Sequence, residues 1–183
     1  MRVSIFLLGL ALLCPGVLSA TTYVVRPDGT GDFQTIQAAI DAAVSGDFIE
    51  LSDGTFEGDG NRDIDYLGKS ITVRSQSGQP GRCIIDCEGS PTTPRRGFVM
   101  EDVNGSGAAL EGVTVLHGYT RVSSLGHGGG AVFCHSSVAS LSNCVFSSCG
   151  ARSNGGLNAY HGEVLLQETS FERNTNAGAG GAV

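Results

Sequence analysis

Apolar residues recur at a fixed interval along the second half of the chain. Leu141 and Leu166 lie 25 positions apart, and the same interval separates Phe146 from Phe171. Glycine-rich segments keep nearly the same interval, at residues 128–130, 155–156 and 180–181. A constant period of this length is typical of a solenoid, in which each coil cannot bury its own apolar side and packs it against the next coil. The pattern therefore predicts a repeat architecture.

Short apolar segments alternate with turns rich in Gly, Ser and Asn, which predicts parallel strands stacked about 4.8 Å apart along the solenoid axis. The expected strands cover residues 23–25, 48–51, 70–75, 83–86, 97–100 and 110–115. When the repeats are aligned by this pattern, two columns of inward residues result. One contains Leu110, Leu141 and Leu166, and the other contains Val115, Phe146 and Phe171. A third column holds Gly118, Cys149 and Asn174, so an asparagine ladder would be incomplete. We expect about five coils, enough to bury a core.

One segment near the N-terminus has helical rather than strand periodicity. The spacing that places side chains on one face of a helix is kept by Ile36, Ala39, Ile40 and Ala43. We expect a short amphipathic helix over Phe33–Val44, with Asp32 as its N-cap and Gly46 just beyond its end. Such a helix would cover the open end of the first coil, whose strand edges would otherwise recruit other chains.

The first residues have the features of an export signal. Arg2 gives a positive start, and an uncharged apolar run of about 11 residues follows over Val3–Leu13. This run is far shorter than the roughly 20 residues that span a bilayer, so it predicts a secretory signal peptide over residues 1–20. We expect the mature chain to be exported, to the cell surface or the medium, and to contain no transmembrane helix.

The remaining chain divides into two regions. Residues 21–68 are expected to form the N-terminal cap and first coil, and residues 69–183 the further coils. The glycine-rich motif begins a third time at Gly180 and the sequence stops at Val183. We therefore expect the coil region to be truncated at its C-terminus.

Composition narrows the range of partners. The net charge is −7 over 183 residues, and only 16% of the residues are charged. Nucleic-acid binding needs a basic patch, so this balance argues against nucleic acid as a partner. The 28 glycines follow no collagen-like period and are interpreted as turn residues.

Cysteine and histidine chemistry is left open by the sequence. The cysteines beyond the signal are Cys83, Cys87, Cys134, Cys144 and Cys149. Disulfides form in exported proteins, but an odd number leaves at least one thiol unpaired, and the pairing is not determined. The spacing of Cys and His favours no zinc site. The histidines lie in or near expected turns, where we expect them to be solvated: His117, His127, His135 and His161.

A polar loop early in the chain concentrates oxygen-bearing side chains. Its strongest candidate ligands for a calcium ion are Asp59, Asn61, Asp63 and Asp65. Calcium takes several oxygen ligands, which this density offers. The spacing is not that of an EF-hand, because Ile64 occupies the position of the loop glycine. The alternative interpretation, a solvated acidic loop that keeps a strand edge soluble, is the preferred one.

Three segments carry a family resemblance. Residues 28–41 (DGTGDFQTIQAAID), 46–47 (GD) and 53–56 (DGTF) resemble the N-terminal end of pectate-lyase-like proteins, and pectin esterases share a similar opening. The resemblance implies an all-β fold, a right-handed parallel β-helix with a short N-terminal capping helix. It is specific for the fold and unspecific for activity.

The same resemblance implies a possible activity. Pectate lyases bind calcium through clustered acidic side chains and use an arginine as base, for which the chain offers Arg95, Arg96 and Arg121. The sequence contains no lyase, pectin esterase or polygalacturonase motif. Whether the protein is an enzyme therefore stays open, with a pectate-lyase-like polysaccharide lyase acting on acidic polysaccharide as the alternative function.

A second resemblance concerns the repeats. Phe171-Glu-Arg-Asn174 followed by Gly180-Gly-Ala-Val183 is similar to the repeats of polymorphic outer-membrane proteins. It implies a secreted or cell-surface protein, in bacteria at the outer membrane, whose loops contact polysaccharide or surface glycans. This is the preferred function. The insertion over residues 119–127, which lengthens one coil, is the loop where we expect function, and residues 104–106 match a glycosylation sequon.

Overall fold

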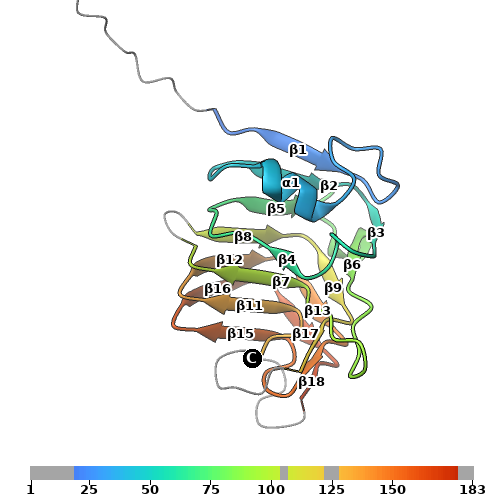
Figure 1. Ribbon diagram of the computed structural model, residues 1–183, viewed down its shortest axis with the longest axis vertical. Coiled ribbons are helices and arrows are strands. Elements are labelled where there is room, and N and C mark those ends of the chain that lie inside the picture. The colour runs from blue at the N-terminus through green and yellow to red at the C-terminus, as the bar shows by residue number, and fades with distance from the viewer. Residues whose placement is uncertain (1–18, 104–106, 122–127, 177–183) are drawn as a thin grey trace, which may run out of the picture.

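The computed structural model describes residues 19–103, 107–121 and 128–176 and shows a parallel β-solenoid of about five turns (Figure 1). Every pairing between named strands of these residues is parallel, as parallel coils stacked on one another require. The predicted all-β parallel β-helix with one small helix is confirmed. Most of the predicted export signal, residues 1–18, lies outside the described residues.

Four sheets run along the solenoid, and each coil contributes one strand to each sheet it visits. Sheet A contains β1 (Thr22–Val25), β2 (Phe48–Leu51), β5 (Thr72–Ser75), β8 (Ala108–Glu111), β12 (Val138–Ser142) and β16 (Glu163–Gln167). Sheet B contains β3 (Gly54–Phe56), β6 (Cys83–Asp86), β9 (Thr114–Leu116), β13 (Val145–Ser147) and β17 (Ser170–Glu172). A 3₁₀ turn at Pro80–Arg82 precedes β6.

The other two sheets complete the coil. Sheet C contains β4 (Ile64–Asp65), β7 (Phe98–Glu101), β11 (Val132–His135) and β15 (Leu157–Tyr160). Sheet D contains β10 (Tyr119–Thr120), β14 (Gly150–Ala151) and β18 (Thr175–Asn176). The last complete coils therefore pass from sheet A through B, D and C before they return to A.

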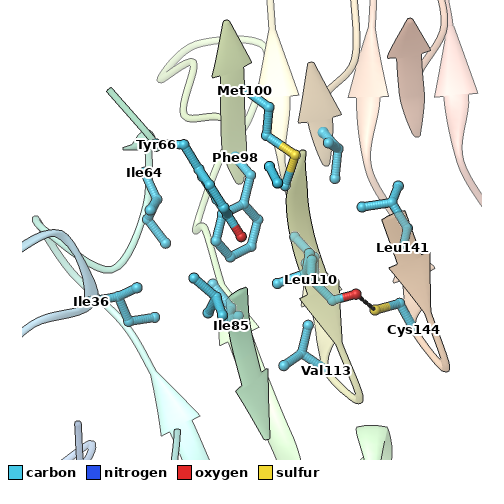
Figure 2. Packing of buried hydrophobic residues seen from close by; sticks show 14 of the residues in the cluster. Ile36, Ile64, Tyr66, Ile85, Phe98, Met100, Leu110, Val113, Leu141 and Cys144 are labelled. Carbon is cyan, nitrogen blue, oxygen red and sulfur yellow. Dashed lines mark hydrogen bonds between the residues drawn. The ribbon is translucent and has the colours of Figure 1, made fainter. Parts of the chain in front are cut away.

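The strand register confirms the predicted columns. Leu141 pairs with Leu110 on one side and with Leu166 on the other. Phe146 likewise pairs with Val115 and Phe171. Leu110, Leu141, Val115 and Phe146 are buried, so the columns are stacks of inward side chains. Figure 2 shows Leu110 and Leu141 within the core, with Phe98 and Tyr66 on the side of Leu110 away from Leu141.

One predicted strand is wrong. The segment 110–115 was expected to be a single strand, but β8 ends at Glu111 and β9 begins at Thr114 in a different sheet. Gly112 turns the corner with φ +66°, a left-handed conformation that glycine adopts without steric cost. Val113 is buried inside the corner, which is why the segment looks continuously apolar in the sequence.

The helix is shorter than predicted. α1 (Ile36–Ala42) replaces the expected Phe33–Val44, and Thr35 is its N-cap through a bond from the Ala38 N–H at 3.2 Å. The predicted cap, Asp32, instead accepts a hydrogen bond from the Val24 N–H at 2.7 Å. The predicted apolar face is confirmed, since all of its residues are buried: Ile36, Ala39, Ile40 and Ala43. α1 packs at the N-terminal end of the solenoid beside β1 and β2 (Figure 1).

The corners of the coil are held by side chains that bond to the preceding coil. Asn174 accepts a bond from the Cys149 N–H and donates one to the Phe146 carbonyl, both at 2.9 Å. One coil earlier, the Cys149 sulfur accepts a bond from the Gly118 N–H at 3.3 Å. The incomplete asparagine ladder is therefore continued by a thiol. At the corner between sheets A and B, the Cys144 thiol donates to the Leu110 carbonyl of the preceding coil, with the sulfur 3.4 Å from the oxygen (Figure 2).

Candidate functional site

Arg96, one of the three candidate catalytic arginines, is held against the solenoid wall. Its guanidinium carbon lies 4.8 Å from the centre of the Phe133 ring, a cation–π contact. One guanidinium nitrogen is also 3.3 Å from the Thr120 hydroxyl and 3.2 Å from the Gly128 carbonyl. These contacts tie the chain on both sides of residues 122–127 to sheet C.

The environment of Arg96 has opposing electrostatic effects. Burial lowers the pKa of its guanidinium, and the carboxylates of Asp63 and Glu101 act in the opposite direction. A general base must reach the proton it removes. Arg96 instead uses its side chain to pack on a ring and to bond to neighbouring loops.

Arg95 and Arg121 lie on two segments of the chain that contact each other. The Arg95 side chain is 3.9 Å from Asp63, and its backbone pairs with Tyr119 in an isolated antiparallel bridge. Arg121 donates a hydrogen bond to the carbonyl of Pro91. The structure thus brings the three arginines to one side of the coil, where each has a structural partner: a carboxylate, a carbonyl or a ring.

The four candidate calcium ligands have separate structural partners. Asn61 is buried; its side-chain oxygen accepts a bond from the Ile36 N–H and its amide donates to the Glu57 carbonyl. Asp59 pairs with Arg62 at 2.8 Å. Asp63 accepts a bond from the Arg96 N–H, and Asp65 accepts one from the Leu67 N–H.

The described part of the chain contains no group of three or more His, Cys, Asp or Glu side chains placed to share a metal ion.

The five cysteines of the described residues are all buried, and none of them forms a disulfide. The sequence alone had left this pairing open. Burial raises the pKa of Cys83, Cys134 and Cys149 to about 12 and that of Cys144 to about 11. Such thiols are poor nucleophiles and poor metal ligands, because both roles require the thiolate.

The expected functional loop is described only in part. Tyr119 and Thr120 form β10 and pair with β14, so the insertion begins after them rather than at Tyr119. Residues 122–127, which include His127, and the sequon at residues 104–106 lie outside the described residues.

One of the remaining histidines differs from the solvated turn residues that were expected: His135 is the last residue of strand β11 and is only partly exposed. His117 is exposed at a corner with φ 50°, as predicted, and has its Nδ1 2.9 Å from the Asp86 carboxylate. His161 is at the corner after β15, as predicted.

An aromatic cluster forms where sheet C turns into sheet A. The register places His135 between Glu101 and Tyr160 in one outward column. The rings of His135 and Tyr160 stack with their centres 5.6 Å apart and an angle of 23° between planes. The ring centres of His161 and Tyr160 lie 4.1 Å apart, with the two rings in an edge-on arrangement. Tyr160, on the last strand of sheet C that the structure describes, keeps 37% of its surface exposed.

A cavity of about 420 Å³ adjoins the cluster at the same corner. Its lining includes Ser136, Val138, His161 and Glu163, from the last two coils described. Val138 is 49% exposed and adds an apolar wall. Among the described residues that line the cavity, none is Lys or Arg. An open cavity with one apolar side, hydroxyl and carboxylate groups, and a ring face at its rim suits a ligand with both apolar and polar faces.

The sequence analysis missed this cluster, although the signal was present. His135 and Tyr160 are 25 positions apart, as are Ser136 and His161, which is the interval of the leucine and phenylalanine columns. Inward residues reveal the interval because they are alike from coil to coil. The outward residues differ in type, so the same interval does not draw attention to them.

No protein-family model matches the chain, and a search of curated proteins finds no match either. Among the described residues, no helix is long and apolar enough to cross a membrane. The fold and the corner site are therefore the observations on which a function is proposed.

Proposed function

We propose that the protein is an exported β-helix that binds carbohydrate at the corner between sheets C and A. The observation that carries the proposal is the stacked pair His135 and Tyr160 at the corner that also holds the cavity. A sugar ring has an apolar face of C–H bonds and a polar edge of hydroxyls. The C–H face suits the negative face of an aromatic ring, and the hydroxyls suit nearby serine and carboxylate oxygens.

The arrangement along the solenoid supports an extended ligand. Equivalent positions in neighbouring coils are separated by about 4.8 Å, so columns of side chains run parallel to the solenoid axis. Glu101, His135 and Tyr160 form such a column, and Ser136 and His161 lie one position further along their coils. A short run of linked sugars therefore meets repeated contacts along one wall. Export is supported by the signal-like residues 1–20.

The test is binding of soluble hexasaccharides to the purified chain, measured by calorimetry. At least one of a glucosamine, an N-acetylglucosamine, a glucose and a galacturonate hexamer should bind. Tyr160→Ala should weaken that binding by about tenfold, which corresponds to the roughly 1.4 kcal/mol expected for losing a ring contact.

Leu165→Ala is the matched control, because Leu165 is an exposed apolar residue of the same coil on the outer side of sheet A. It should leave binding within about twofold, since isolated exposed apolar residues are common and carry no specific contact. Binding that is equal in both variants would refute the proposed site. Formation of unsaturated product from polygalacturonate and calcium would instead support the lyase alternative.

A further inference from the structure

The charges around the corner site favour one class of sugar. Glu163 lines the cavity, and Glu101 lies next to His135 in the outward column. Asp102 follows Glu101 at the corner and is exposed. Arg96, which lies against the same wall, is packed on Phe133 and bonded to Thr120 and Gly128. Arg96 also interacts electrostatically with Glu101, so Glu163, which lines the cavity itself, is the main charge that a ligand would meet.

We infer that the ligand of this site is a glycan that carries protonated amines, such as one built from glucosamine units. The inference rests on the proposed carbohydrate site and specifies its ligand. A protonated amine gains charge-assisted hydrogen bonds from Glu101 and Glu163. It also gains a cation–π contact where it approaches the partly exposed ring of Tyr160.

The same charges disfavour direct binding of the polysaccharide class implied by the pectate-lyase resemblance. A polyuronate carries one carboxylate per sugar and would be placed beside Glu101, Asp102 and Glu163. Like charges in contact oppose binding, and they provide specificity by rejecting the wrong ligand. The net charge of −7 adds a weaker repulsion over the whole surface, which salt would screen.

The decisive comparison uses two hexamers with the same sugar backbone. The glucosamine hexamer carries amines, and the N-acetylglucosamine hexamer carries neutral amides at the same positions. At a pH at which the amines are protonated, the glucosamine hexamer should bind at least tenfold more tightly than its acetylated counterpart. The galacturonate hexamer should show no binding.

Carboxylate variants assign the preference to this site. Glu163→Gln and Glu101→Gln should each weaken glucosamine binding about threefold, because single contacts with exposed charges are modest. Together they should weaken it about tenfold, and each should weaken binding of the acetylated hexamer by a smaller factor than binding of the glucosamine hexamer. Glu111→Gln is the control, because Glu111 is a carboxylate on the outer side of sheet A that does not line the cavity.

The outcomes separate the two proposals. If none of the hexamers binds, the carbohydrate site itself is refuted, and this inference falls with it. If the acetylated hexamer or the galacturonate hexamer binds as tightly as the glucosamine hexamer, the site stands and the preference for amines is refuted. If the preference is found but survives both glutamate substitutions, the assignment to Glu101 and Glu163 is wrong.

Discussion

At the scale of single residues, the cysteines show how a thiol can serve a structural role usually given to an oxygen or an amide. Cys149 lies between Gly118 and Asn174 in a ladder, and its sulfur accepts the Gly118 N–H as the Asn174 oxygen accepts the Cys149 N–H. Sulfur is a weak acceptor, but the site is dry and the bond is repeated by its neighbours. The thiol therefore continues the ladder without the bulk of an asparagine.

This role predicts chemical inertness. Desolvation raises the pKa of Cys149 to about 12 and that of Cys144 to about 11, so both thiols stay protonated well above the pH at which an exposed cysteine ionises. Iodoacetamide at pH 8.5, counted by mass spectrometry, should leave the buried cysteines of the folded chain unmodified. The same reagent should modify all of them in guanidinium chloride.

Val138→Cys supplies the positive control, because Val138 is 49% exposed and a thiol there meets the reagent directly. The folded variant should take up one label quickly. Rapid labelling of Cys144 or Cys149 in the folded protein would contradict the buried ladder. If Cys144 and Cys149 are still not labelled by iodoacetamide after unfolding under reducing conditions, their thiols carry another modification.

At the scale of elements, helix α1 depends on a residue distant in sequence. Asn61 accepts the Ile36 N–H at 3.0 Å and donates to the Glu57 carbonyl at 2.9 Å, and it is only 7% exposed. The first N–H groups of a helix have no partner within the helix, so Asn61 supplements the cap made by Thr35. The polar loop thus fixes the helix over the first coil.

Asn61→Ala should therefore lower the free energy of unfolding by about 1–3 kcal/mol, since it leaves the buried Ile36 N–H without its partner and removes the bond to the Glu57 carbonyl. Urea unfolding followed by circular dichroism measures the change. Asp59→Asn is the matched control in the same loop and should have little effect, because the Asp59 side chain is 89% exposed.

Calcium distinguishes this interpretation from the metal-binding one. With a structural role for the loop, added calcium should leave the unfolding midpoint of the wild-type chain unchanged. A rise in the midpoint that Asp59→Asn abolishes would show that the loop binds the ion, because a ligand stabilises the state that binds it.

The elements also show which features the sequence predicted and why. The columns of Leu141 and Phe146 were predictable because inward positions need similar apolar side chains in every coil. The corners were harder, since what they share is a backbone conformation. Gly112, Asn143 and Glu168 occupy equivalent corners with φ of 66°, 50° and 48°, yet have no side-chain chemistry in common. The break between β8 and β9 was missed for this reason.

The helix cap and the site were missed for related reasons. Asp32 and Thr35 are both good N-caps by residue type, and only the bond from Val24 to Asp32 decides between them. His135 and Tyr160 meet across coils, so their contact depends on register rather than on neighbouring sequence. The contact of Arg96 with Phe133 likewise joins residues that are distant in the sequence.

At the scale of the whole molecule, each coil contacts mainly the coils before and after it, so one coil should be removable if the register is kept. Deleting residues 142–166 removes 25 residues and joins Leu141 to Gln167, which already occupies the position equivalent to Ser142. Phe171 then stacks on Val115, and Asn174 faces Gly118 in place of Cys149. Every inward column continues with a compatible side chain.

This deletion should give a chain that unfolds in one cooperative transition at a lower temperature than the parent, because fewer stacked interfaces remain. Deleting residues 143–166 removes 24 residues and is the control. It moves Phe171 by one position, and because side chains alternate between the faces of a strand, its ring turns from the core to solvent. We expect this second variant to show no cooperative transition in thermal melting followed by circular dichroism. If the two variants melt alike, the alternation of inward and outward residues does not determine the register in which the coils stack.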